Sequence, residues 1–150
     1  MDKIFITADS GADIPSERAK DLGIHIVPFH LSIGEHHCDD GEIEPVDMLE
    51  LCQAKKILPK TSACSPYDYE RVFGRILEKD PNAHIIHLGY SAATTSSFQS
   101  ARFAAEKTGR VTCVDTCFAS GGYGLIAGKI AHAVRSNPKM SAESAVGLAE

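Results

Sequence analysis

The chain has no tryptophan, and its 15 lysine and arginine residues form no basic cluster among its 150 residues. With 20 aspartates and glutamates the formal net charge is −5, so the electrostatic signature of a nucleic-acid-binding protein is missing. No apolar run approaches the length that spans a bilayer, and no basic-then-apolar leader opens the sequence. We therefore expect a cytoplasmic protein that neither binds nucleic acid nor is integral to a membrane.

Cysteine is present, but its pattern excludes a disulfide framework. The five cysteines are an odd number, and they are spread along the chain without the spacing of a disulfide-rich or zinc-binding module. Free thiols are the expectation.

The pattern of apolar residues predicts the fold class. Composition (43% hydrophobic, 23% charged) is that of an ordinary globular protein, and we expect residues 1–150 to form a single α/β domain. Strands are expected at 3–7, 25–33, 83–88 and 111–114, and helices at about 15–22, 45–54, 66–77, 94–107, 119–135 and 141–150. Strands that alternate with helices favour parallel pairing, which predicts a three-layer α/β/α fold with a mainly parallel sheet.

Four loops in this pattern are rich in hydroxyl groups. They follow expected strands or extended segments and precede expected helices, at residues 7–13, 60–65, 91–97 and 115–117. Open α/β sheets build ligand sites at such strand ends. Helix N-termini there favour an anion, and hydroxyl groups add neutral hydrogen bonds, so the loops suit a carboxylate or a phosphate. The alternative is that each hydroxyl only caps its own helix.

The same loops carry a resemblance to a known family. Residues 7–15 (TADSGADIP) resemble the opening T-D-S-T-A-D-L-P of the DegV family of bacterial fatty-acid-binding proteins, and residues 26–29 (IVPF) resemble its V-V-P-L strand. Residues 60–66 (KTSACSP) resemble P-x-T-S-Q-P-S, and residues 91–101 resemble S-S-x-L-S-G-T-Y-Q-S-A. A D-G pair at 40–41, V-D-T at 114–116 and S-G-G-Y-G at 120–124 complete the series. The chain thus resembles the first domain of DegV proteins, which are roughly twice as long.

This resemblance implies a lipid-binding protein that holds one long-chain fatty acid with its tail in an apolar tunnel. Its carboxylate-binding residues carry over to Thr61, Ser62 and Ser91. Candidate supporting donors are Ser10, Thr95 and Ser120. It also implies a partner fatty acid kinase to which the bound acyl group is presented, and no catalytic residue, cofactor or metal in this chain. The second, C-terminal domain of the family is absent from this sequence.

The sequence departs from the family pattern at two loop positions. Ala92 replaces the family's second serine and removes one possible head-group donor, and Ser96 replaces a glycine. Both changes bear on head-group affinity and on ligand choice.

Two other functions fit parts of the sequence. Ser91 lies between a strand and a helix like the nucleophile of an α/β hydrolase, and Asp115 and His132 follow in the order of an esterase triad. Residues 36–40 (HHCDD) have metal-ligating side chains, although their spacing is poor and a solvated turn is the simpler interpretation. For Asp9, Asp13 and Asp115 we expect capping and turn hydrogen bonds.

Overall fold

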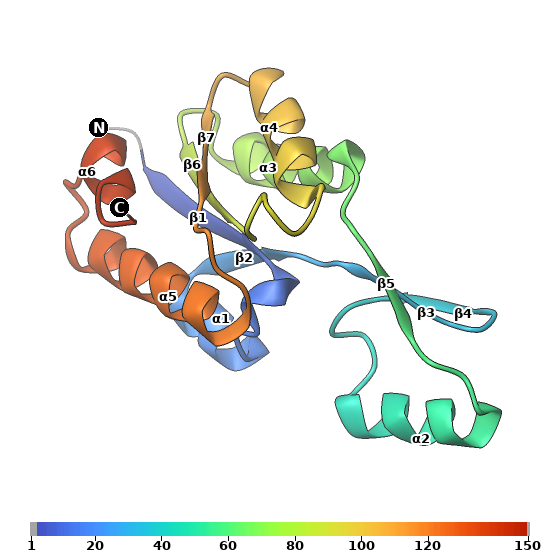
Figure 1. Ribbon diagram of the computed structural model, residues 1–150. Coiled ribbons are helices and arrows are strands. Elements are labelled where there is room, and N and C mark those ends of the chain that lie inside the picture. Colours follow the sequence, from blue (N-terminus) through green and yellow to red (C-terminus); the bar gives the residue numbers. More distant parts are fainter. Residues whose placement is uncertain (1–2, 150) are drawn as a thin grey trace.

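The computed structural model describes residues 3–149, and its centre is a parallel sheet of four strands in the order β2-β1-β6-β7 (Figure 1). These strands are β1 (Ile4–Asp9), β2 (Ile24–Val27), β6 (His84–Gly89) and β7 (Val111–Asp115). In the register, Ile6 pairs with Ile24 on one side and with Ile86 on the other. The parallel sheet predicted from the alternating strands and helices is confirmed.

Helices cover both faces of this sheet. On one face lie α1 (Ser16–Leu22), α5 (Ser120–Ser136) and α6 (Ala142–Val146), and on the other lie α3 (Pro66–Lys79) and α4 (Ser97–Glu106). Side chains alternate along β6, so Ile86 and Leu88 join the core under α5 while Ile85 joins the core under α3 and α4. The result is the predicted three-layer α/β/α arrangement.

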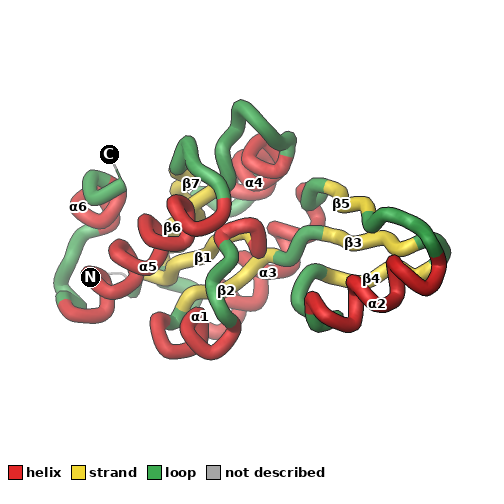
Figure 2. The backbone as a smooth tube through the Cα atoms, turned by 60° about the horizontal axis from the view of Figure 1, so that its bottom comes forward, coloured by secondary structure: helices red, strands yellow, loops and turns green. Residues whose placement is uncertain are grey.

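A second, antiparallel sheet extends from this body. Its strands, in the order β4-β3-β5, are β3 (His30–Ile33), β4 (His36–Asp39) and β5 (Lys60–Ser62). Helix α2 (Pro45–Lys55) packs on one face around a small core of Leu31, Ile33 and Cys52. Figure 2 shows this unit to one side of the parallel sheet. We call residues 30–62 the extension and the rest of the described chain the body.

Two expectations about the extension were wrong. The alternating pattern of residues 25–33 predicted one strand, but the segment is divided between β2 of the body and β3 of the extension. Pro28 lies at the division, and its missing N–H makes it unsuited to the middle of a sheet. Residues 36–39, interpreted as part of a solvated turn, instead form β4.

Helix ends follow the local sequence closely. The N–H and hydroxyl groups of Ser65 donate to Oδ2 of Asp68 at 2.8 and 2.7 Å, and Pro66 occupies the first turn of α3. Gly23 ends α1 with a φ of 70°, a value that glycine adopts without strain. Ser141 caps α6 as predicted, but that helix ends at Val146 instead of running to the last residue.

Candidate functional site

Three of the four predicted loops gather at one edge of the parallel sheet, whereas residues 60–62 of the fourth form β5 of the antiparallel sheet. Because β1, β6 and β7 are parallel neighbours, their carboxyl ends lie together, with Ala8 beside Leu88 and Gly89 beside Asp115. The segments that follow are residues 10–13, 90–97 and 116–120, none of which contains lysine or arginine. This edge therefore offers hydroxyl and backbone N–H donors with no basic side chain of its own.

Ser91 occupies the middle of this edge. Its residue surface is only 8% exposed, its N–H donates to the carbonyl of Phe118 at 3.1 Å, and its own carbonyl accepts from Thr94. Within residues 3–149 its hydroxyl group makes no hydrogen bond. A serine whose backbone is fixed and whose hydroxyl is unpaired suits the binding of an oxygen-bearing ligand.

Thr61 and Ser62 lie on β5, at the edge of the extension, and both are exposed. Their register partners on β3 are Leu31 and His30, respectively. Because successive strand residues face opposite ways, Thr61 shares the face of Leu31 and Ser62 shares the face of His30. Ser62 contributes to a shallow cavity of about 490 Å³ on that face.

Hydrogen bonds connect the segment that follows β5 to the loop that carries Ser91, residues 90–97. After β5 the chain reaches Cys64, whose N–H donates to Oγ of Ser97 at 3.2 Å, and Ser97 also accepts from the Thr95 hydroxyl at 3.1 Å. The Cys64 thiol donates to the carbonyl of Pro28 at 3.1 Å, and burial raises its pKa to about 12, so the thiol remains protonated. Ser97, which sequence reasoning did not single out, is the junction between the two predicted loops.

The three candidate supporting residues have different roles. Ser10 uses its hydroxyl oxygen to accept the N–H of Phe29 at 3.0 Å, which ties the first loop to the β2–β3 connection. Thr95 is engaged with Ser97, as described above. Ser120 is exposed and opens α5 with a positive φ of 53°. Ser10 and Thr95 therefore shape the loops.

Asp115 makes the turn contacts expected of it, but Asp9 does not. The Asp115 carboxylate accepts from the N–H groups of Cys117 and Ala92, the former at 2.9 Å. Asp9 is fully buried, and accepts instead from the hydroxyl of Tyr69 at 2.5 Å and from the N–H of Tyr90 at 2.9 Å. Local sequence carries no signal for this contact, because Tyr69 is distant along the chain.

Two further buried polar groups complete the surroundings of Asp9. The hydroxyl of Tyr123 accepts from the Asp9 N–H at 2.7 Å and donates to the carbonyl of Leu88. Nδ1 of His87 lies 3.0 Å from the Thr7 hydroxyl, while its Nε2 is 3.7 Å from Asp9. Burial lowers the pKa of His87 despite the opposing effect of Asp9, and burial together with Asp9 raises the pKa of both tyrosines. The hydrogen bond from the Tyr90 N–H to Asp9 ties this buried cluster to the turn that carries Ser91.

The structure does not assemble the esterase triad. His132 is exposed on α5, twelve residues after its start, which at ~1.5 Å per residue is about 18 Å along the helix from the edge that carries Ser91. Its ring lies beside Ser136, and Asp115 is occupied by backbone N–H groups. The order of residues along the chain was misleading because α5 runs away from the site.

The HHCDD segment does not gather metal ligands. Its residues alternate along β4, where His37 contacts Ser32 and Asp39 contacts His30. Across residues 3–149 no group of three histidine, cysteine, aspartate or glutamate side chains is arranged to hold a metal ion. The five cysteines are free thiols, as expected. None of the helices in the described part of the chain is long and apolar enough to cross a membrane.

Comparison with known proteins identifies relatives over nearly the whole chain. Residues 3–146 match the model of the DegV family, described as a family of uncharacterised proteins. A DegV domain-containing protein of Deinococcus radiodurans is 31% identical over 135 residues, which cover 89% of this chain and 47% of that protein. One from Caldanaerobacter subterraneus is 29% identical over 134 residues, covering 87% and 47%. The chain thus spans about half the length of the curated relatives it matches.

Solved structures agree with this match. A fatty-acid-binding DegV family protein from Thermus thermophilus superposes with a TM-score of 0.85 at 29% identity, over 98% of this chain and 52% of that one. DegV from Bacillus subtilis, a fatty acid binding protein, shares the fold with a TM-score of 0.89 at 20% identity, over 99% of this chain and 53% of its own. The chain belongs to the DegV family.

Proposed function

We propose that this chain binds a long-chain fatty acid, with its carboxylate at the sheet edge that carries Ser91. The unpaired hydroxyl of Ser91, held on a fixed backbone between two other loops, is the observation that carries the proposal. Thr61 and Ser62 are the further donors, supplied from β5. The relatives described as fatty-acid-binding proteins support the same ligand class.

The chemistry of the edge supports a role in presenting the fatty acid rather than in converting it. Hydroxyl groups hold a carboxylate by neutral hydrogen bonds, whereas a bidentate arginine would form a strong ion pair. A carboxylate without such a counter-charge retains a nucleophilic oxygen. We propose that a partner fatty acid kinase uses this oxygen to accept a phosphoryl group from ATP, while this chain turns over nothing by itself.

The binding proposal is tested by mass spectrometry and by titration. Solvent extraction of the purified chain is expected to release fatty acid in near-equimolar amount. In a titration with oleate, Ser91→Ala is expected to weaken binding about tenfold to hundredfold, because a hydrogen bond to a charged group contributes roughly 1.5–3 kcal/mol. The matched control is Ser16→Ala, an exposed serine at the start of α1, which should leave the affinity unchanged. Equal affinities of Ser91→Ala and the unmodified chain would contradict the proposal.

The presentation proposal needs a separate assay. The loaded chain, a fatty acid kinase and ATP labelled at the γ-phosphate are expected to give acyl phosphate only when all three are present. Acyl phosphate formed equally well from free oleate without this chain would refute the presenting role and leave the binding proposal untouched.

A further inference from the structure

Polar side chains of the extension contact helix α3 of the body. The extension has an apolar core of Leu31, Ile33 and Cys52 that is separate from the two cores that line the parallel sheet. Two covalent connections join it to the body, one from β2 to β3 and one from β5 to α3, as the ribbon shows (Figure 1). The position of β5 relative to the body therefore depends on the contacts that polar side chains of the extension make with the body.

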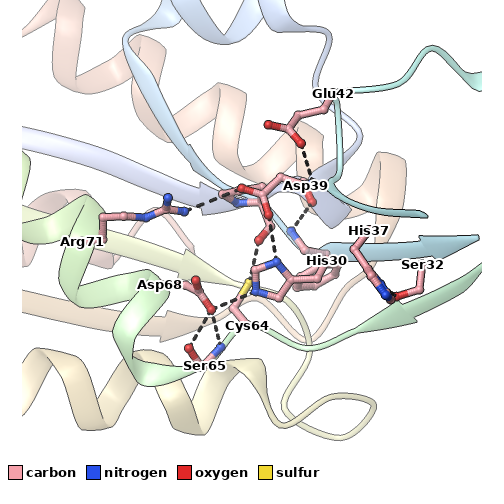
Figure 3. A network of polar contacts seen from close by, with 12 residues as sticks. His30, Ser32, His37, Asp39, Glu42, Cys64, Ser65, Asp68 and Arg71 are labelled. Carbon is pink, nitrogen blue, oxygen red and sulfur yellow. Dashed lines mark hydrogen bonds and ion pairs between the residues drawn. The ribbon is translucent and has the colours of Figure 1, made fainter. Parts of the chain in front are cut away.

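One of those contacts is a histidine between two carboxylates, drawn in Figure 3. Nδ1 of His30 on β3 lies 2.8 Å from Oδ1 of Asp39 on β4, and its Nε2 lies 3.0 Å from Oδ2 of Asp68 on α3. Arg71, one turn along α3, pairs with the other oxygen of Asp39 at 3.7 Å. We call His30, Asp39 and Asp68 the His30 bridge. It begins on the extension and ends on a helix of the body.

The geometry of the His30 bridge determines the protonation of the ring. A neutral imidazole has one N–H donor and one bare nitrogen, and an ionised carboxylate can only accept. A bare nitrogen 3.0 Å from a carboxylate oxygen would place two lone pairs against each other. Because both ring nitrogens face carboxylate oxygens, the contact is satisfied only when both nitrogens carry a proton, which is the imidazolium form.

We propose that His30, as the imidazolium, is a positioning residue that seats the extension on α3 and so sets where the β5 hydroxyls meet the fatty acid carboxylate. The register places Ser62 directly opposite His30 and Thr61 opposite its neighbour Leu31, so a shift of β3 carries both hydroxyls with it. Ser91 belongs to the body, so a shift of β3 does not carry it. Loss of the second proton of His30 then weakens fatty acid binding. This inference rests on the proposed function.

The surroundings of His30 favour the imidazolium from several elements. On α3 it faces Asp68 and Arg71, and on β4 it faces Asp39, whose N–H is bound by Glu42. His37 of β4 and Lys60 of β5 lie farther along the same face of the sheet, opposite Ser32. Both carboxylates contact the ring directly, whereas Arg71 contacts Asp39 rather than the ring.

The direction of the pH dependence follows from these contacts. The hydrogen bond to Asp68 raises the pKa of His30, partial burial opposes this, and Asp39 adds to the rise. Burial acts to raise the pKa of Asp68, but hydrogen bonds from Ser65 and His30 outweigh it and lower that pKa. The His30 bridge is therefore complete between pH 3.8, the ordinary pKa of an aspartate, and pH 6.5, the ordinary pKa of a histidine. It is lost as the pH rises through the raised pKa of His30. Below 3.8 it is lost as the pH falls through the lowered pKa of Asp68.

The test compares oleate binding between about pH 5.5 and 8.5 for the unmodified chain, His30→Gln and His37→Gln. His37 lies on the same face but contacts only Ser32, so its variant is the matched control. The unmodified chain and His37→Gln should lose up to about fivefold in affinity across this range, because exposed charged pairs contribute at most about 1 kcal/mol. His30→Gln should bind weakly throughout, with a flatter profile. The ionisation of oleate itself is common to all three and cancels in the comparison.

A second measurement examines the bridge without ligand. The imidazole ¹⁵N shifts of His30 should report the doubly protonated ring at the acid end, and the hydrogen-exchange protection factors of the β3 and β5 amides, which are corrected for the intrinsic rate at each pH, should fall as that ring loses a proton. Equal pH profiles in His30→Gln and the unmodified chain would overturn the inference and leave the proposed function standing. If the chain bound no oleate at any pH, while His30 titrated and the β3 and β5 amides exchanged as expected, the proposed function would be wrong and the role of His30 in positioning the extension would stand. Protection factors that are independent of pH and of His30 would overturn the positioning role directly.

Discussion

The body and the extension of this protein treat charged side chains in opposite ways. In the body, Asp9 and His87 are wholly buried, and two tyrosine hydroxyls and backbone groups surround them. In the extension, the side chains of His30 and Asp39 are 37% and 30% exposed. A thick core can hold a carboxylate by hydrogen bonds in a fixed place, whereas a thin sheet uses ion pairs that solvent and pH influence. The body should therefore fix the site, and the extension should adjust it.

The largest effect is expected from removing apolar volume in the body. Phe73 on α3 is fully buried against Tyr69 and His87, and Phe73→Ala should lower the free energy of unfolding by about 3–5 kcal/mol, because a large cavity remains. Urea denaturation measures this change. Leu125→Ala, at a residue 77% exposed, should change it by at most about 0.5 kcal/mol. Similar losses from the two substitutions would mean that the body is not the rigid part of the molecule.

A smaller, local effect is expected in the extension. Leu31 belongs to the small core with Ile33 and Cys52, and Leu31→Ala should destabilise the extension by about 2 kcal/mol through a smaller cavity. Hydrogen exchange of the β3 and β4 amides should accelerate, while the β6 amides keep their rates. Equal acceleration in β6 would show that the two units unfold as one, contrary to the comparison above.

Removing one hydroxyl group from the buried cluster around Asp9 should also lower the free energy of unfolding. Tyr69→Phe leaves the Asp9 carboxylate without the donor at 2.5 Å, and an unsatisfied buried acceptor costs roughly 1–3 kcal/mol. Thermal unfolding measures the loss. Tyr67→Phe, on the same helix but 71% exposed, is the control and should be neutral. If both variants matched the unmodified chain, the Asp9 cluster would not contribute to the stability of the body.

The smallest effect is expected from the exposed ion pairs of the extension. Replacing His30 by glutamine should lower the free energy of unfolding by under about 1 kcal/mol near pH 6, because exposed charged pairs are screened by solvent. The contribution is complete below pH 6.5 and is lost as the pH rises through the raised pKa of His30. Urea titrations of both proteins near pH 6 and pH 8.5 should therefore converge at the alkaline end. A difference that grew with pH would have the wrong sign for an imidazolium.

Much of the fold was predictable because its determinants are local. The capping residues Ser65 and Ser141, the glycine after α1 and the alternation of strands with helices all act within a few residues, so the sequence reveals them. The gathering of the hydroxyl loops followed from the parallel order of the strands. The extension was missed because residues 25–33 alternate as one strand would, although β2 and β3 pair with different partners on either side of Pro28.

The sequence by itself determined the layered fold, the positions of most helices and the loops that carry Ser91, Thr61 and Ser62. Only the tertiary structure decided that Asp9 is buried among tyrosines, that His132 lies far from Ser91, and that His30 joins carboxylates from two units. The physical reason is the separation along the chain over which each interaction acts. Capping and periodicity act between neighbours in the chain, whereas the contacts of Asp9 with Tyr69 and of His30 with Asp68 join residues that folding alone brings together.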